Sequence, residues 1–545
     1  NISFVGNTVY SSEELIRQLG IESGDIFDQT VLDSRLFGSQ EGTDISSLYL
    51  DDGYLFFNAT PIEVAASDRK IDLEVRVYEG KQARVNKVMI KGNTKTNDHV
   101  ILREVRTKPG DVFNKEDIMR TQRELSQLGF FNDQGFQVNP MPNPAKGTVD
   151  IEYVVEEKSS DQIELSGGYG GAGPSTPGRI IGTVGLSFNN FSTKNFFKKE
   201  AWSPLPGGDG QRLSIRAQSN GRYYQGYNFS FTEPWLGGKK PNSLSFWVNR
   251  TALSTTGFLR SDPNYTGLSI TGTGVGLGRR KRWPDDYFTA YYELSYQYYD
   301  VMKDTRFPLF NEGYANDIAL KYVLQRSSVS APIYPQSGSN FTLTAKATLP
   351  YSYFSDDVDY ASMTDRERYL FLEYYRFKFT GEWFLPLTAD KKLILMPRFG
   401  FGYIGMYNKS KGLTPFDRYS MGGSGLSGVN QLGGREIIAL RGYDDQSISA
   451  NGGDPIIAKY TLELRYPISL NPQATFYALT FLEAGNTYPT FDKFNPFNVK
   501  RAAGVGIRVF LPMFGMLGLD YGFGFDKLDS WSTGAGSTSG SDASI

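Results

Sequence analysis

The chain has 545 residues, and its 57 lysine and arginine residues nearly balance 59 aspartate and glutamate residues, which leaves a net charge of -2. This balance argues against a nucleic-acid-binding protein of the usual basic kind. Cysteine is absent and His99 is the only histidine, which excludes thiol catalysis, zinc–thiolate sites and disulfides and leaves almost no material for a histidine triad. We therefore expect no catalytic residue, no metal ion and no cofactor.

The aromatic content is high for a chain that is not hydrophobic overall. There are 34 tyrosines, 38 phenylalanines and 59 glycines beside a mean hydropathy of -0.37. No stretch approaches 18 uninterrupted apolar residues, which excludes a transmembrane helix. A membrane β-barrel fits such a composition, because its strands alternate and average to moderate hydropathy. The length predicts two or more domains, or one very large barrel.

The first 158 residues contain an internal repeat. Ile2–Asn7 (ISFVGN) returns 86 positions later as Val88–Asn93 (VMIKGN). Residues 71–75 (IDLEV) return 78 positions later as residues 149–153 (VDIEY). The smaller spacing of the second pair indicates an insertion in the first copy, which we place around residues 37–46.

Each copy of the repeat predicts one α/β module. The pattern in both is a strand, two helices and then two strands with alternating apolar residues. Ser11 and Asn97 stand where a side chain can cap the first helix of each copy. We expect modules at residues 1–82 and 83–158, which together form an arm.

Beyond residue 159 the pattern changes to strands separated by Gly, Asn, Asp and Pro. In Phe341–Leu349 (FTLTAKATL) apolar residues alternate with threonine and lysine, and the same alternation with larger aromatics recurs along residues 288–298 and 375–385. We count about fifteen such strands, which predicts a β-barrel domain over residues 159–527. Residues 528–545 form a Gly/Ser-rich tail that is not expected to be a strand.

A soluble β-sandwich would also alternate, with its polar face in water. The large aromatics on strand after strand, and the absence of a complementary set of short strands, favour an antiparallel barrel with its apolar face in lipid. A closed barrel pairs every backbone group without water, which an open sheet does not. Bacterial single-chain barrels have even strand numbers, so we expect one further strand that the pattern does not identify.

The first predicted strand ends in glycines, and one loop is unusually long. These glycines either weaken the pairing of the strand or merely relieve crowding in the barrel wall. They are Gly167, Gly168, Gly170 and Gly171. The loop, at about residues 408–454, shows no regular periodicity and contains the sequence ALRGYDD. Loops of this length are usually functional or disordered.

Several motifs in this order resemble the BamA family of outer-membrane protein assembly factors. They are the duplicated module pattern, FTEPWLG at residues 231–237, PIYPQSGS at residues 332–339, and MGGSG followed by ALRGYDD at residues 421–445. The resemblance implies POTRA modules followed by a 16-stranded transmembrane antiparallel β-barrel. Because members usually have more than two POTRA modules, it also implies further modules before Asn1.

The resemblance implies that the long loop folds into the lumen and holds an R-G-[FY] tip, here Arg441, Gly442 and Tyr443, against the inner wall. Its acidic partners would be Glu463 and Glu483. The alternation independently puts Glu463 on the polar face of its strand, whereas Glu483 shares a face with an apolar neighbour, residue 481. An arginine in a partly shielded lumen needs such partners, because an unpaired buried charge is costly.

The resemblance further implies assembly and insertion of outer-membrane β-barrel proteins through POTRA capture and a weak seam between the first and last strands. The implied location is the outer membrane of a Gram-negative bacterium, with the POTRA modules in the periplasm. The implied partners are unfolded outer-membrane proteins, accessory outer-membrane lipoproteins and membrane lipid. Two alternatives stay open: a polypeptide-secreting or autotransporter-assembly transporter of the same superfamily, and an enzyme with a fused hydrolase, which the lack of a G-x-S-x-G motif disfavours.

Overall fold

The computed structural model divides into two compact units, one of Asn1–Asp161 with Phe188–Gln211 and the other of Gln162–Ser187 with Arg212–Ile545. The residues that it describes are 2–22, 24–38, 44–67, 70–132, 135–158, 161–170, 179–202, 205–305, 307, 309–331, 333–354, 358–423, 431–432, 435–449, 452–471, 474–511 and 515–526. No helix in these ranges is long and apolar enough to cross a membrane.

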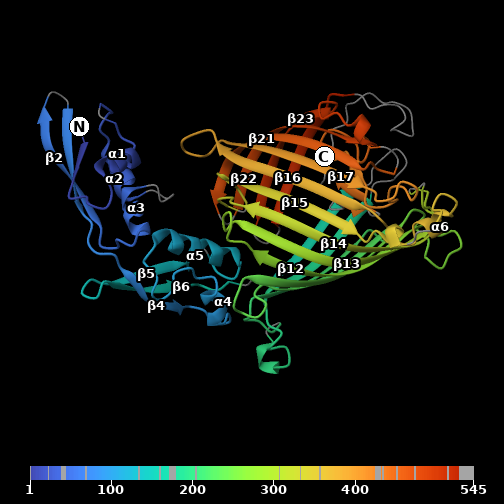
Figure 1. The fold of residues 1–545 in the computed structure, drawn as a ribbon, viewed down its shortest axis with the longest axis horizontal. Coiled ribbons are helices and arrows are strands. Elements are labelled where there is room, and N and C mark those ends of the chain that lie inside the picture. Colours follow the sequence, from blue (N-terminus) through green and yellow to red (C-terminus); the bar gives the residue numbers. More distant parts are fainter. Residues whose placement is uncertain are drawn as a thin grey trace. The chain divides into compact units, whose positions relative to one another are not determined.

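The first unit contains two modules, each a three-stranded sheet with helices against it (Figure 1). In both, the first strand runs parallel to the third, which occupies the centre of the sheet. The elements of the first module are β1 (Ile2–Val5), α1 (Ser12–Leu19), α2 (Gln29–Phe37), α3 (Ile45–Asp51), β2 (Asn58–Ser67) and β3 (Lys70–Tyr78). Those of the second are β4 (Arg84–Lys91), α4 (Asp98–Leu102), α5 (Lys115–Gln127), β5 (Gln137–Asn143) and β6 (Thr148–Val154).

The repeated Gly-Asn pair forms the same turn in both modules. Gly6 and Gly92 each have a φ of +92°, which L side chains rarely adopt. A Cβ atom at either glycine would overlap a backbone carbonyl oxygen, that of Val77 in one module and that of Val155 in the other. The turn therefore requires glycine, which explains why it recurs at corresponding points of the repeat.

A buried or half-buried carboxylate closes this turn in each module. Glu157 accepts hydrogen bonds from the amides of Thr94 (2.8 Å), Lys95 (2.8 Å) and Thr96 (2.7 Å). Burial raises the pKa of Glu157, but the hydrogen bonds from Thr94, Thr96 and the backbone outweigh it and lower the pKa to about 2. Glu79 accepts equivalent hydrogen bonds from the turn of the first module.

The helices differ between the copies in two ways. Ser11 caps α1 in a capping box with Glu14, but the side chain of Asn97 makes no capping hydrogen bond to α4. The first module also has a third helix, α3, where the sequence predicted two helices. Asp44 caps α3 by accepting from the amide of Ser47 at 2.8 Å, and the helix begins at Ile45, at the end of the stretch predicted to be inserted.

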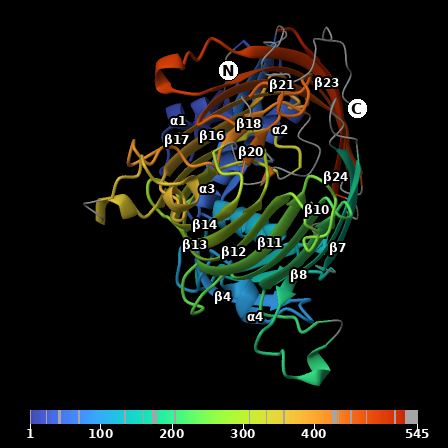
Figure 2. The ribbon, with the colours of Figure 1, turned by 90° about the vertical axis from the view of Figure 1, so that its right-hand side faces the viewer.

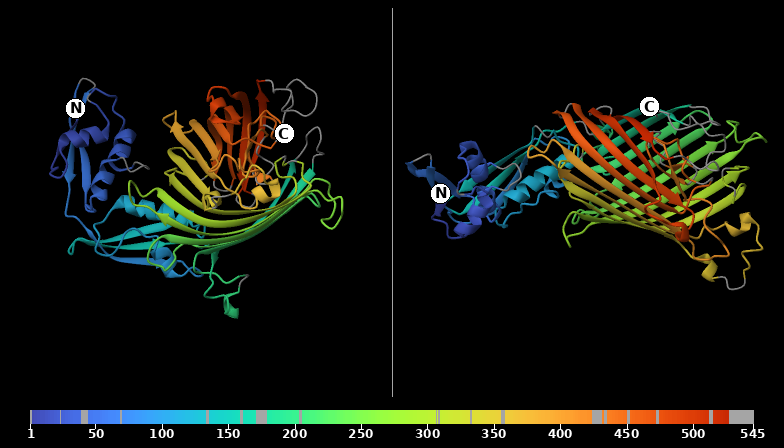
Figure 3. Two further views of the ribbon diagram at one scale, coloured as in Figure 1. Left: turned by 45° about the vertical axis from the view of Figure 1, so that its right-hand side comes forward. Right: turned by 90° about the horizontal axis from the view of Figure 1, so that it is seen from above.

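The second unit is built on a 15-stranded antiparallel sheet that curls upon itself (Figures 2 and 3). This confirms the predicted fold class and the fifteen strands counted from the sequence, and within the described residues no sixteenth strand joins the sheet. The strands, in order, are β7 (Gln162–Gly170), β8 (Arg179–Phe191), β9 (Gln211–Ser219), β10 (Tyr224–Glu233), β11 (Asn242–Ser254), β12 (Gly267–Arg280), β13 (Phe288–Met302), β14 (Gly313–Ser327), β15 (Gly338–Thr348), β16 (Tyr375–Pro386), β17 (Ile394–Gly405), β21 (Ile456–Asn471), β22 (Ala474–Tyr488), β23 (Lys500–Leu511) and β24 (Gly515–Gly524).

The curled sheet is apolar outside and polar inside. Tyr292 on β13 is 49% exposed, whereas its neighbour Glu293 is 8% exposed. Leu462 and Glu463 on β21 show the same contrast. Exposed aromatic and aliphatic side chains on one face with buried charges on the other reverse the arrangement of a water-soluble sheet, and suit a wall whose outer face meets lipid.

Strands β7 and β24 are the two ends of the strand order. Within the described residues, each is hydrogen-bonded to one neighbouring strand, β7 to β8 and β24 to β23. Gly167 and Gly168 pair with Gly182 and Ile181, and Gly170 pairs with Arg179. Two parts of the chain to which the sequence drew attention, Gly171 and the tail at residues 528–545, lie outside the described residues.

The connection between β17 and β21 is the long loop. It forms a small sheet of β18 (Tyr419–Met421), β20 (Arg435–Ile438) and β19 (Gln431–Leu432), which lies inside the curve of the large sheet (Figure 2). Phe416 and Tyr419 of the loop are fully buried in one hydrophobic cluster with Tyr299, Ile404 and Ile457 of the wall. The loop thus packs as an internal core. Short helical turns complete the unit at Tyr351–Phe354, Asp365–Arg368 and Phe491–Lys493.

Candidate functional site

Arg441 lies at the tip of the long loop, with its side chain buried against the inner wall. Its Nη2 is 2.9 Å from Oε1 of Glu463 on β21 and 2.8 Å from Oε1 of Glu483 on β22. Its backbone amide also donates to Oε2 of Glu483 at 2.9 Å. All three residues are at most 6% exposed. The structure therefore brings together the arginine and both glutamates that the sequence analysis singled out.

Two further residues complete this arrangement. Nη1 of Arg441 is 3.5 Å from Oδ2 of Asp520 on β24, and its guanidinium carbon is 3.5 Å from the ring centroid of Phe481. The sequence analysis missed both. From the sequence, an inward position of Glu483 was less clear, because Glu483 shares a face of its strand with Phe481. The structure turns that face inward, and the ring of Phe481 packs against the guanidinium of Arg441. We call Arg441, Glu463, Glu483, Asp520 and Phe481 the clasp.

Each carboxylate of the clasp also has a cation of its own. Lys459 Nζ is 3.0 Å from Glu483, Arg465 Nη2 is 2.6 Å from Glu463, and Arg508 Nη1 is 2.7 Å from Asp520. Four cations thus face three carboxylates in a nearly water-excluded place. Buried charges are tolerated when they are paired in this way, so the clasp holds the loop tip without leaving a charge unpaired.

Gly442 brings the backbone of the tip into direct contact with β24. Its φ is +93°, and a Cβ atom there would lie 2.7 Å from the backbone amide nitrogen of Gly524. A Cβ atom on Gly522 would lie 2.9 Å from the amide nitrogen of Gly442. Three glycines therefore permit the close approach, and no other residue type fits without moving one of the two segments.

Tyr443 continues the contact to the end of β24. Its hydroxyl donates to the carbonyl oxygen of Arg501 at 2.8 Å and accepts from the amide of Asp526 at 3.1 Å. Together with the clasp, the R-G-Y tip contacts β21, β22, β23 and β24. The tip therefore ties the last four strands of the described sheet to one another from the inside.

A second ionic network holds the other side of the loop. Asp417 accepts from Lys346 of β15, with 3.0 Å between Nζ and Oδ2, and also pairs with Arg376 of β16. Glu436 pairs with Arg376 and with Lys378. The loop is thus anchored to two separate parts of the wall, β15–β16 and β21–β24. The five side chains are each at most 28% exposed, so the network is largely shielded from solvent.

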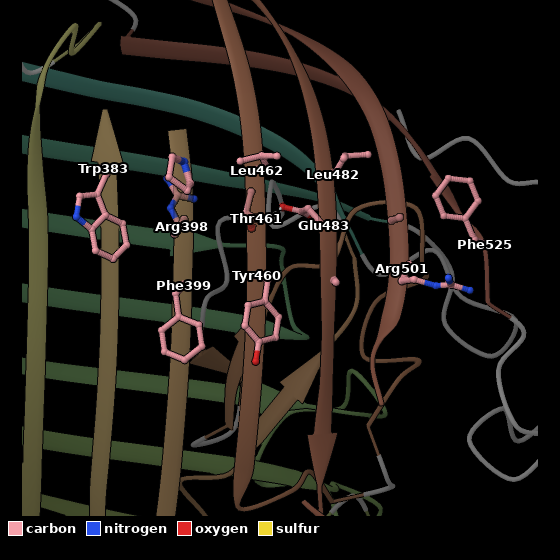
Figure 4. Close-up of a pocket in the computed structure, with 13 residues that line it drawn as sticks. Trp383, Arg398, Phe399, Tyr460, Thr461, Leu462, Leu482, Glu483, Arg501 and Phe525 are labelled. Carbon is pink, nitrogen blue, oxygen red and sulfur yellow. Dashed lines mark hydrogen bonds between the residues drawn. The ribbon is translucent and has the colours of Figure 1, made fainter. Parts of the chain in front are cut away.

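The outer surface of the same wall contains a hollow of about 610 Å³ (Figure 4). Trp383, Phe399, Tyr460 and Leu482 line it with apolar surface, and Ala484 contributes little bulk. Alternation along β22 separates Leu482, outside, from Glu483 in the clasp. Among the described residues, no group of three or more histidine, aspartate or glutamate side chains is arranged to hold a metal ion.

Two protein families match the chain. The family described as "Omp85 superfamily domain" matches residues 207–536, which include the curled sheet from β9 onward and the long loop. The family described as "Surface antigen variable number repeat", or POTRA, matches residues 1–80 and 83–158. The second match coincides with the two copies of the internal repeat.

Individual relatives agree with the family matches. A protein of Neisseria meningitidis serogroup B named "Outer membrane protein assembly factor BamA" is 23% identical over 445 residues, which is 78% of this chain and 49% of that protein. The chain thus spans about half the length of that curated relative. A relative from Neorickettsia risticii with the same name is 30% identical over 118 residues, which is 22% of this chain and 16% of that protein.

Solved structures share the fold. A crystal structure of BamA from Haemophilus ducreyi lacking POTRA domains 1–3 has a TM-score of 0.55 and 19% identity, and the match covers 97% of this chain and 96% of that one. CdiB from Escherichia coli has a TM-score of 0.52 and 13% identity, with 97% and 87% covered. At these identities the likeness concerns the fold alone.

Proposed function

This chain belongs to the Omp85 superfamily, and we propose from that premise that it assembles and inserts β-barrel proteins in the outer membrane of a Gram-negative bacterium. The observation that carries the proposal is the contact between the R-G-Y tip and β24, one of the two end strands of the sheet. Because the tip holds β24 from inside the sheet, the unpaired edge of β24 can stay in place while it accepts a new strand.

The proposed seam lies between β7 and β24. Each is bonded to a single neighbouring strand within the described residues, and β7 contains Gly167, Gly168 and Gly170, which weaken its pairing. An edge strand offers unpaired N–H and C=O groups to any extended segment. We therefore assign to this edge the templating of the first strand of an incoming client.

The arm would capture clients by the same chemistry. In the first module β2 is an edge strand, and in the second β5 is. β5 contains Pro140 and Pro142, which lack amide donors, whereas β2 contains only Pro61, and both strands are largely exposed. We propose β2 as the edge to which extended outer-membrane polypeptides add, with the POTRA modules in the periplasm.

The partners follow from this role. They are unfolded outer-membrane proteins, accessory outer-membrane lipoproteins docked on the arm, and the lipid around the apolar outer face of the sheet. The role is non-enzymatic: no bond is made or broken, and the free energy of client folding drives insertion. Support for the role comes from the name "Outer membrane protein assembly factor BamA" carried by relatives from Neisseria and Neorickettsia.

Depletion of the protein in its own cells tests the proposal. We expect many outer-membrane β-barrel proteins to decrease together in the membrane fraction and to accumulate unfolded in the periplasm. Loss of a single secreted polypeptide, with the other barrels unchanged, would instead identify a secretion transporter of the same superfamily. Complementation with an Arg441→Ala variant then tests whether the clasp serves assembly, because normal barrel levels would contradict that role.

A further inference from the structure

The connection between β8 and β9 has a rigid base and an exposed tip. In the base, Ser192 donates from its amide to the carbonyl oxygen of Pro206 at 2.8 Å, and its hydroxyl donates to Asp209 at 2.6 Å. The amide of Gly208 donates to the carbonyl oxygen of Asn190 at 2.8 Å. We define the base as residues 190–192 with 206–210, and the tip as residues 193–202.

The base is bound to the second POTRA module within the first compact unit. Asn97 donates from its backbone amide to Gly208 and from its side chain to Asp209, both at 3.0 Å, instead of capping α4. Asn190 donates to the hydroxyl of Thr96 at 2.8 Å. Gly208 has a φ of +119°, and a Cβ atom there would lie 2.7 Å from the carbonyl oxygen of Lys95. The base is therefore held in place.

The tip presents three aromatic side chains to solvent. Phe197 is 91% exposed, and Phe196 and Trp202 are each more than 40% exposed. The ring of Phe196 lies between the other two, with centroid distances of 5.4 Å to Phe197 and 5.3 Å to Trp202. The indole N–H of Trp202 donates to the carbonyl oxygen of Phe196 at 2.9 Å, which holds the cluster together. A contiguous apolar patch of this kind on a fixed base marks an interaction surface.

Exposed basic residues surround the aromatic cluster. Lys194, Lys198 and Lys199 lie on the tip with one acidic residue, Glu200, and all four are exposed. The tip therefore carries an excess of positive charge around its aromatic rings. Aromatic side chains such as tryptophan and phenylalanine prefer the interface between lipid headgroups and acyl chains. Lysines beside them are attracted to anionic lipid.

We propose that the tip inserts its aromatic cluster into the headgroup region of an anionic phospholipid bilayer. The inference rests on the proposed membrane location of the sheet. Along the chain, the tip connects β8 and β9, and Val184, Leu186 and Ile215 of these strands are exposed and apolar. A protein partner would also cover aromatic rings, but the three exposed lysines around this cluster, against one glutamate, favour an anionic lipid surface. The tip then anchors the second POTRA module, through the base, to the membrane surface.

The absence of cysteine allows a direct test with the whole 545-residue chain. A Phe197→Cys variant, labelled with a polarity-sensitive fluorophore and reconstituted in phosphatidylethanolamine and phosphatidylglycerol vesicles, is compared with an Ile26→Cys variant. Ile26 is 95% exposed on the first module and serves as the matched control. We expect blue-shifted emission and quenching by headgroup-brominated lipid at residue 197, and quenching by aqueous iodide at residue 26.

The inference fails if iodide quenches both labels equally in vesicles. It also fails if residue 197 becomes protected only after a periplasmic extract is added, because that result identifies a protein partner. Quenching by brominated lipid should fall at least about threefold when Lys194, Lys198 and Lys199 are all changed to Gln, and only with anionic vesicles. Equal quenching in the triple variant and its parent would overturn the role of anionic lipid.

Failure of the lipid anchor can be distinguished from failure of the proposed assembly function. Correct reconstitution of the sheet is verified in each sample by the heat-dependent shift in gel mobility typical of folded membrane barrels. If depletion leaves outer-membrane barrels unchanged while residue 197 is in lipid, the assembly role fails and the lipid anchor stands. If depletion removes many barrels while residue 197 stays in water, the anchor alone fails.

Discussion

Gly442 at the loop tip and Gly524 on β24 approach so closely that a Cβ atom at residue 442 would lie 2.7 Å from the amide nitrogen of residue 524. This contact joins a loop inside the curled sheet to an end strand of that sheet. Around it, the clasp supplies charge pairing to β21, β22 and β24. Close packing, charge pairing and the two anchors of the loop each hold the tip, and separate variants distinguish their contributions.

Changing Gly442 to Ala should displace the tip from β24. The positive φ by itself costs about 1 kcal/mol for alanine, and overlap with β24 adds about 1–3 kcal/mol. Gly221→Ala is the control, because Gly221 has a φ of +80° and no atom within 4 Å of a Cβ there. Trypsin cleavage after Arg441 should accelerate in the first variant only. Equal cleavage in the two variants would show that the contact with β24 does not hold the tip.

Changing Arg441 to Ala should destabilise the folded sheet by about 2–3 kcal/mol in urea unfolding from detergent. This is below the ~3–5 kcal/mol expected for a buried pair broken outright, because Lys459, Arg465 and Arg508 still neutralise the carboxylates. Arg441→Lys should be intermediate, since an ammonium lacks the planar fork. Arg76, an arginine on the arm whose side chain is 64% exposed, provides the control, and Arg76→Ala should change stability by less than about 0.5 kcal/mol.

The second anchor predicts a measurable coupling between Lys346 and Asp417. In a double-mutant cycle with Lys346→Met and Asp417→Asn, the coupling free energy should be about 1–3 kcal/mol, because the two side chains are in contact and only 14% and 10% exposed. The exposed pair of Arg76 and Glu74 should give about 0–1 kcal/mol by the same method. Coupling of the first pair no larger than that of the second would rule out the anchor as a source of stability.

The turn closed by Glu157 should weaken in acid. The pKa of this carboxyl is about 2 when folded against an ordinary 4.5, so its stabilisation is present above pH 4.5 and is lost as the pH falls toward 2. Since the group is only partly buried, we expect on the order of 1 kcal/mol after solvent screening. Amide hydrogen exchange at Thr94 and Thr96 should be faster in Glu157→Gln than in the parent at pH 6. At pH 3 the difference should be smaller; a difference independent of pH would exclude this carboxylate as the cause.

The fold followed from local patterns in the sequence. Period-two alternation marked the strands of the curled sheet, and the repeated Gly-Asn pair marked the two modules, because each depends on neighbours a few residues apart. The third helix, α3, was missed. The sequence predicts two helices in each module and an insertion around residues 37–46, whereas the structure forms α3 at Ile45–Asp51 and buries its Ile45 and Tyr49.

The site also has features that the sequence predicted and features that only the tertiary structure revealed. By itself the sequence determined that an arginine stood in an aperiodic loop and that Glu463 belonged to the polar face of its strand. Tertiary structure decided that Asp520 and Phe481 join them, that Gly442 meets Gly524, and that the loop has a second anchor at Asp417. Alternation specifies which face a residue occupies, whereas contacts between residues about forty to eighty positions apart depend on how the sheet curls and where the loop enters it. These long-range contacts therefore depend on the fold of the whole chain, and no single stretch of the sequence predicts them.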